Sequence, residues 1–147
     1  MTENLTTSRL LSNPVQLIPL QFMQDNVAAS QTDVQIPIAQ VASAAENAIA
    51  GYKMPWAGVV VGISAVLEAA GSAGSLTIGA TVNGTEAADP TLSITTEASK
   101  ADTAFRGAAP FAAGDVIGAE ITTDGTWNGT SADLGVTVWC LVELSGV

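Results

Sequence analysis

The sequence contains no histidine and only four basic residues in 147. Without histidine, imidazole acid–base catalysis, Ser-His and Cys-His nucleophile pairs and most zinc sites are excluded. Fourteen acidic residues bring the net charge to −10, so the chain lacks the basic patch that binds nucleic acid or an anionic membrane surface. We therefore expect neither nucleic acid nor a membrane as a partner.

Cysteine and long apolar runs are also scarce. The single cysteine, Cys140, allows no internal disulfide, and its apolar neighbours in sequence predict a buried, unreactive thiol. The longest apolar run, Met54–Leu67, ends at Glu68 and is shorter than the roughly 20 residues that cross a bilayer, so we interpret it as core. The first residues lack the basic stretch of a secretory signal, and we expect none.

Apolar residues, by contrast, are abundant. They make up 48% of the chain, and charged residues only 12%, against about 25% charged in a typical soluble domain. The length fits one domain with its own core. Because excess apolar surface on a small chain is commonly buried between subunits, the composition indicates assembly.

The first 45 residues differ in composition from the rest. They are rich in Gln, Asn and Ser, and the apolar runs Val15–Leu20 and Val34–Ile38 each contain a proline, which argues against a central strand. Two interpretations stay open: a loosely attached first strand, or an arm that lies on a partner. We predict an extended N-terminal arm over residues 1–45 and a β domain over residues 46–147. A capping-box pattern at Ser43–Glu46 predicts a short helix ending near Gly51.

From about residue 52 onward, alternating apolar residues indicate strands. Asn83-Gly84 and Asp124-Gly125 are the strongest hairpin signals, because both central residues of a type I′ turn need positive φ. In the last run, the even-numbered residues from Val136 to Val142 are expected on one side and the odd-numbered residues on the other. This spacing predicts an all-β sandwich or barrel. The predicted strands are Trp56–Leu67, Ser75–Val82, Thr91–Thr96, Val116–Thr123 and Leu134–Leu144.

Acidic side chains are the remaining candidates for chemistry. Two carboxylates could act as an acid–base pair, or several could bind calcium. However, no calcium-loop motif is present, and aspartates at turns are expected because they hydrogen-bond their own backbone. We therefore expect no enzyme, metal or cofactor. The residues concerned are Asp89, Asp102, Asp115, Glu120, Asp124 and Asp133.

Tryptophan is the other residue type that could mark a binding site. Trp56 and Trp139 lie in apolar runs and are expected in the core or at a subunit contact, together with Val60 and Leu141. Trp127, beside Asn128 in a predicted turn, is the one tryptophan expected to be exposed. A sugar could stack on it there.

Three segments, taken in order, resemble known virion proteins. Phe111–Ile121 resembles the F-x-x-G-D-x-[IV] turn and strand of trimeric jelly rolls of the tumour-necrosis-factor and complement-C1q type. Together with Met54–Ser64, Ser75–Gly84 and Val136–Leu144, it is similar to phage capsid decoration (cement) proteins and to the heads of short fibres. The resemblance implies that the β domain over residues 46–147 is a jelly-roll β-sandwich that forms a homotrimer.

The function that this resemblance implies is structural. A homotrimeric decoration protein would bind the major capsid protein on the outer surface of an icosahedral phage head and stabilise the shell. Residues 1–45 would then strap onto neighbouring subunits by strand addition, so deletion of residues 1–30 is expected to leave the trimer folded but unable to bind. The alternatives are a trimeric fibre tip that binds a receptor or glycan, and a small cellular carbohydrate-binding module. The expected anchors of the arm are Val15, Leu17, Ile18, Leu20 and Phe22.

Overall fold

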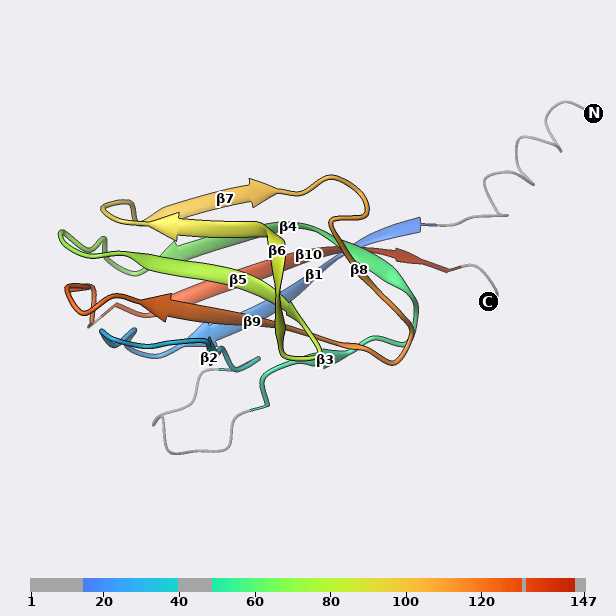
Figure 1. Ribbon diagram of the computed structural model, residues 1–147, viewed down its shortest axis with the longest axis horizontal. Coiled ribbons are helices and arrows are strands. Elements are labelled where there is room, and N and C mark those ends of the chain that lie inside the picture. Colours follow the sequence, from blue (N-terminus) through green and yellow to red (C-terminus); the bar gives the residue numbers. More distant parts are fainter. Residues whose placement is uncertain (1–14, 40–48, 131, 145–147) are drawn as a thin grey trace, which may run out of the picture.

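The computed structural model describes residues 15–39, 49–130 and 132–144, which form a β-sandwich of two antiparallel sheets (Figure 1). The described residues contain no helix. Sheet A has the strand order β1 (Val15–Gln24), β10 (Leu134–Glu143), β4 (Gly58–Leu67) and β7 (Ser99–Thr103), and β8 (Ala109–Phe111) also pairs with β4. Sheet B has the order β2 (Val34–Gln35), β9 (Val116–Thr123), β5 (Leu76–Val82) and β6 (Thr85–Ile94), and β3 (Tyr52–Lys53) also pairs with β9.

The core lies between the two sheets and is built from one side of each strand. In β10 the even-numbered residues from Leu134 to Val142 are buried and the odd-numbered residues face outward, which confirms the predicted alternation. Cys140 is among the buried residues, and burial raises the pKa of its thiol to about 12. The largest fully buried side chains include Phe22, Ile36, Ile63, Leu76, Ile78, Leu92, Ile94, Ile117, Ile121 and Leu134.

The segment predicted as an arm is, from residue 15 onward, part of the sandwich. β1 pairs with β10 along its whole length, from Val15 opposite Glu143 to Gln24 opposite Leu134. Leu20 and Phe22 are buried in the chain's own core, and the Phe22 ring packs edge-to-face on Tyr52 with centroids 5.5 Å apart. The predicted boundary at 45/46 is therefore wrong for residues 15–39. Deletion of residues 1–30 would remove an edge strand and its core side chains, so the truncated chain is not expected to fold as proposed.

Of the two predicted hairpin turns, one is confirmed and one is wrong. Asn83 and Gly84 adopt φ of 53° and 78° and join β5 to β6, as expected for a type I′ hairpin. The hairpin predicted at Asp124-Gly125 is wrong, because β9 and β10 lie in different sheets. There the Asp124 carboxylate accepts a hydrogen bond from the Thr126 N–H at 2.9 Å and from the Ser75 hydroxyl at 2.8 Å. The helix predicted from Ser43 falls largely on residues 40–48, outside the described residues.

The predicted strand bounds are also right for some strands and wrong for others. Val116–Thr123 is found as predicted, and Leu134–Leu144 ends one residue earlier than expected. β6 begins at Thr85, six residues before its predicted start, and includes a cis Asp89–Pro90 peptide bond. β7 was not predicted, because all five of its residues are exposed and show no alternation. Its place in sheet A comes entirely from pairing with β4.

Candidate functional site

The outer side of sheet A is the most distinctive surface of the described fold. We call it the apolar face: it consists of the side chains of β1, β10, β4 and β7 that alternate away from the core. Leu17 is 53% exposed, Val66 61% and Trp139 36%. The members of the apolar face are Val15, Leu17, Pro19, Gln21, Met23, Val59, Val61, Ser64, Val66, Ser99, Ala101, Thr103, Thr137, Trp139 and Leu141.

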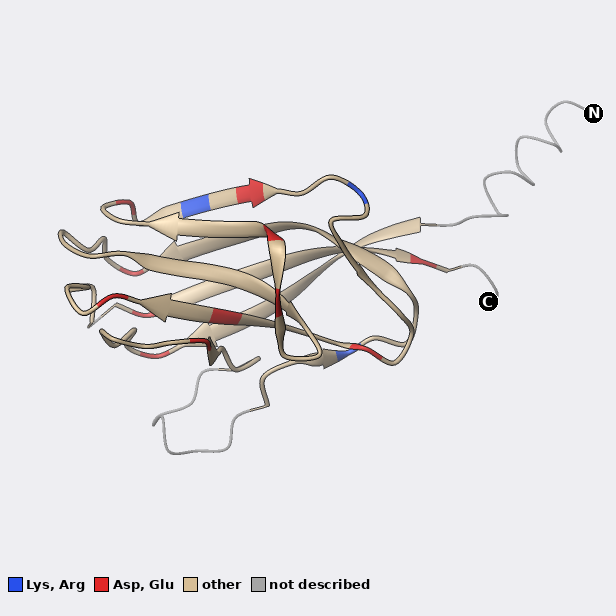
Figure 2. Ribbon diagram, in the orientation of Figure 1, with Lys and Arg blue, Asp and Glu red and all other residues tan. Residues whose placement is uncertain are grey.

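This face is nearly free of charge in a chain whose net charge is −10. β1 and β4 carry no charged residue, and β10 carries only Glu143, at its end. Figure 2 shows the same strands in tan, with charge at the end of β10 and along β7. Apolar, uncharged surface is common where a soluble protein contacts another macromolecule.

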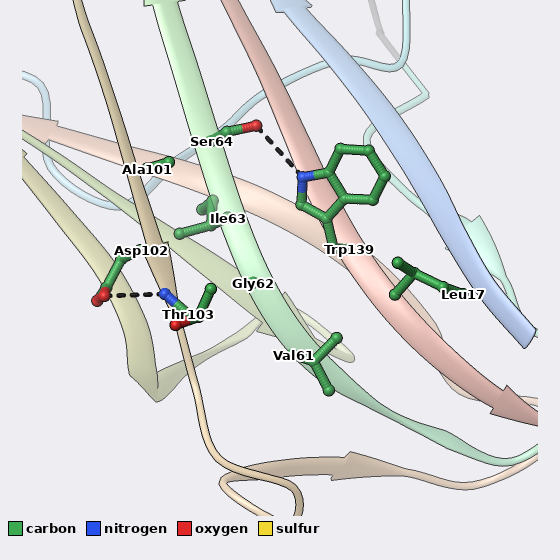
Figure 3. Close-up of a pocket in the computed structure, with 9 residues that line it drawn as sticks. All are labelled: Leu17, Val61, Gly62, Ile63, Ser64, Ala101, Asp102, Thr103 and Trp139. Atoms are coloured by element: carbon green, nitrogen blue, oxygen red, sulfur yellow. Dashed lines mark hydrogen bonds between the residues drawn. The ribbon is translucent and has the colours of Figure 1, made fainter.

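A hollow of about 350 Å³ lies in the apolar face between β1, β10, β4 and β7 (Figure 3). Gly62 forms part of its wall, where an added Cβ would come within 3.3 Å of the Asp102 carbonyl oxygen and 3.6 Å of Trp139. The missing side chain therefore leaves space beside the indole. The hollow is lined by Leu17, Val61, Gly62, Ile63, Ser64, Ala101, Asp102, Thr103 and Trp139.

Trp139 is held in place at one side of this hollow. Its indole N–H donates a hydrogen bond to the Ser64 hydroxyl at 3.3 Å, and Gly62 is its opposite residue on β4. Because the polar atom of the indole is already bonded within the sheet, the exposed part of the ring is apolar. Asp102, at the far side, accepts a hydrogen bond from the Thr103 N–H at 2.8 Å (Figure 3). The hollow thus offers an apolar surface with fixed side chains.

The outer side of sheet B is different in character. Its centre is polar and acidic, with Glu120 on β9 flanked by Glu86 and Asp33. The Gln35 amide donates to the Glu120 carboxylate at 2.6 Å, and the Thr81 hydroxyl donates to the Gln35 amide oxygen at 3.3 Å. Burial raises the pKa of the Glu120 carboxyl, and the charges of Glu86 and Asp33 raise it further. The two outer faces of the sandwich are therefore chemically opposite.

The residues predicted for the core or the trimer contact are divided by the fold. Val60 is fully buried between the sheets. Trp139 and Leu141 lie instead on the apolar face, because they alternate with Cys140 along β10. Trp56 is 40% exposed and precedes β4. The expectation that the two tryptophans are core residues is wrong for both, whereas a subunit contact stays a prediction.

The arm anchors are also divided. Leu20 and Phe22 are buried and Ile18 packs against the core, so these three cannot contact a partner while β1 stays paired. Val15 and Leu17 face outward, and both belong to the apolar face.

Trp127 is buried, in contradiction to its predicted exposure. It is 2% exposed, and its indole N–H donates to the Val27 carbonyl at 3.1 Å. Glycines let two loops close over the ring: a Cβ on Gly129 would approach the ring to 2.4 Å, and one on Gly71 to 3.1 Å. A sugar therefore cannot stack on Trp127 in this conformation.

Asn128, the other residue of that predicted loop site, is exposed but occupied. Its side-chain oxygen accepts from the Ser72 and Ala73 N–H groups at 2.8 and 3.1 Å, and its amide donates to the Ser72 hydroxyl at 2.9 Å. Asn128 thus ties the loop after β9 to the loop before β5.

The acidic residues do not form a metal site in the part of the chain that the structure describes: no three His, Cys, Asp or Glu side chains gather there as potential ligands. Asp115 accepts hydrogen bonds from Asn83 and from the Ala112 N–H, which lower the pKa of its carboxyl. Within the described ranges, no helix has the length and apolarity to cross a bilayer.

The apolar face was not predicted as a surface. The run Met54–Leu67 was interpreted as core, although in β4 it also contains a second apolar set that faces outward, with Val59 and Val61 half-buried and Val66 exposed. The signal was present as apolar residues on both sides of one strand, a pattern that predicts cover on both sides. Comparison of the sequence with protein-family models and with curated proteins gave no match.

Proposed function

We propose that this protein is a structural virion component: a homotrimeric decoration protein that binds the major capsid protein on the outer surface of an icosahedral phage head. The observation that carries the proposal is the contrast between the two outer faces. The apolar face is suited to contact with protein, and the outer side of sheet B, where the acidic side chains of Glu86 and Asp33 are exposed, is suited to solvent. A protein that covers a shell needs one face of each kind.

The strand order supports the jelly-roll part of the proposal. β1 lies beside β10 in sheet A, and β2 lies beside β9 in sheet B, so early and late strands are neighbours in both sheets. The chain also changes sheets between β4 and β5, between β6 and β7, and between β9 and β10. Both features are typical of a jelly roll, in which a long antiparallel ribbon wraps around the core.

The composition and the apolar face support the trimer part of the proposal. Three copies arranged around an axis would cover part of the apolar face, whose side chains are costly to leave in water, and leave the rest for contact with the shell. A trimer also multiplies contacts with the shell, so weak single contacts add to a strong attachment that exists only on the assembled lattice.

Copy number in purified virions tests the decoration role. A ratio to the major capsid protein approaching one is expected, because decoration sites cover the whole shell. A few copies per particle would instead place the chain at a vertex or the tail, as expected for a fibre tip, and would overturn the decoration role.

A pair of matched variants tests the use of the apolar face. Val66→Asp adds a charge to that face and is expected to reduce trimer formation or capsid binding at least tenfold. Ser93→Asp adds the same charge to an exposed position on sheet B and is expected to change neither. Equal effects of the two substitutions on both measurements would contradict the assignment of the faces.

A further inference from the structure

Among the described residues, the outer edge of β1 is covered along only half of its length. Because β1 ends sheet A in the described fold, no described strand pairs with its backbone groups on the side away from β10. Two hydrogen bonds identify the residues that point to this side: the Met23 N–H donates to the Pro37 carbonyl at 2.9 Å, and the Tyr52 hydroxyl donates to the Gln21 carbonyl at 3.1 Å. Backbone groups alternate sides along an antiparallel strand, so the odd-numbered residues of β1 point to the outer edge.

Pro19 is consistent with this assignment. As an odd-numbered residue, it directs its nitrogen, which carries no hydrogen, to the outer edge, so pairing between β1 and β10 loses no donor. Toward the end of β1, Pro37 and Tyr52 cover the edge. Toward its beginning, the outward backbone groups of Val15, Leu17 and Pro19 have no hydrogen-bond partner among the described residues. We call Val15–Pro19 the open edge.

Of the usual protections of exposed strands, the open edge has a proline, Pro19, but no charge and no cover among the described residues. Edge strands generally carry charges or proline, or are covered or bulged, so that they do not pair with other chains. β1 has no charged side chain, and Val15 and Leu17 are 47% and 53% exposed beside backbone groups that no described residue binds. In a chain of net charge −10, such a segment is a place where two copies can meet without direct repulsion.

We propose that the open edge pairs with the open edge of a second copy, as two antiparallel β1 strands related by a two-fold axis at Leu17. Each Leu17 then exchanges N–H and C=O hydrogen bonds with its counterpart, and each Val15 N–H donates to the Pro19 carbonyl of the other copy. Pro19 supplies only an acceptor, which is the one backbone group that it has. The pairing ends before Tyr52, which occupies the edge at Gln21.

This contact goes beyond the proposed function, because a two-fold pairing does not build a trimer. It would join one copy to a copy in a neighbouring trimer and continue sheet A across the two. The pairing can therefore be tested on the purified protein without a capsid. The result does not depend on whether the protein decorates a phage head.

The test compares two substitutions at Leu17 in the full-length protein by sedimentation velocity over a range of concentrations. Wild type is expected to associate reversibly as concentration rises: a monomer would double its mass, and a trimer, which has three open edges, would form assemblies of two or more trimers. Leu17→Ala removes the side chain but keeps the N–H, and it is expected to retain this step. Leu17→Pro removes the outward N–H and is expected to weaken it at least tenfold, although the fold is kept, as at Pro19.

Three outcomes would overturn the proposal. The first is a wild-type protein that does not associate in this way up to millimolar concentration, and the second is a Leu17→Pro variant that associates like wild type. The third is an equal loss in Leu17→Ala and Leu17→Pro, which would assign the contact to the side chain on the apolar face and leave the proposed function standing.

A cysteine variant keeps the test decisive if Leu17→Pro does not fold. Leu17→Cys places two thiols opposite each other at a Cα separation of about 5.5 Å, within the range that a disulfide spans. It is expected to form a disulfide-linked dimer in a buffer of reduced and oxidised glutathione, in which oxidised glutathione takes up the two electrons. The matched control Ser93→Cys, at an exposed position on sheet B away from the edge, is expected to form at least tenfold less. Equal yields from the two variants would contradict the paired edge.

Discussion

Replacement of Phe22 by alanine tests whether residues 15–24 are a strand of the sandwich or an arm that binds elsewhere. Phe22 is fully buried and packs edge-to-face on Tyr52. Removal of a buried phenylalanine costs about 3–5 kcal/mol, from lost apolar transfer and the cavity left behind. In a chain of this length each kcal/mol lowers Tm by about 3 °C, so we expect a fall of roughly 10–15 °C.

The matched control is Leu17→Ala, five residues earlier on the same strand. Leu17 points outward and is half exposed, so its truncation is expected to cost no more than about 1 kcal/mol. Urea unfolding at one fixed protein concentration, followed by tryptophan fluorescence, gives both values, and an unchanged m-value shows that the same surface unfolds. Equal and small effects of Phe22→Ala and Leu17→Ala would refute the placement of β1 in the core.

Three further outcomes follow from the site. Trp127→Ala is expected to lower the stability by about 3–5 kcal/mol in urea unfolding, because the ring is buried under two loops; a change below about 1 kcal/mol would contradict this burial. Glu120→Gln is expected to stabilise the protein at neutral pH. The folded-state pKa of Glu120 is raised, so wild-type stability is lost as pH rises through that pKa, and an unchanged stability–pH curve in the variant would refute the assignment. The Cys140 thiol, with a pKa of about 12, is expected to stay unmodified by a thiol reagent at pH 8 until the protein is unfolded; modification of the native protein would contradict its burial.

The sequence predicted well those strands in which every second residue is buried, and the turn that needs particular residues. The alternation of β10 and the bounds of β9 follow from apolar residues at every second position, which reflect one buried side. The turn at Asn83-Gly84 follows from the need for positive φ at two successive residues. Similarly, the apolar neighbours of Cys140 predicted its burial.

Elements without a local signal depended on distant partners. β7 shows no alternation because it lies at an edge and all its residues are exposed, so only pairing with β4 defines it. The aspartate at 124 formed a local turn with Thr126, but whether the next strand returned to the same sheet was decided by the packing of the whole chain. The local hydrogen bonds of an aspartate turn are the same whether the next strand stays in the sheet or crosses to the other one.

The sequence by itself determined that this protein is an acidic, histidine-free, all-β chain with more apolar residues than one small core needs. Only the tertiary structure decided where the excess lies. Pairing of β1 with β10 turned Phe22 inward and Leu17 outward. The loops that contain Gly71 and Gly129 closed over Trp127. Period-two alternation divides a strand into two sides, but the choice of the side that is covered belongs to the elements that pack against it.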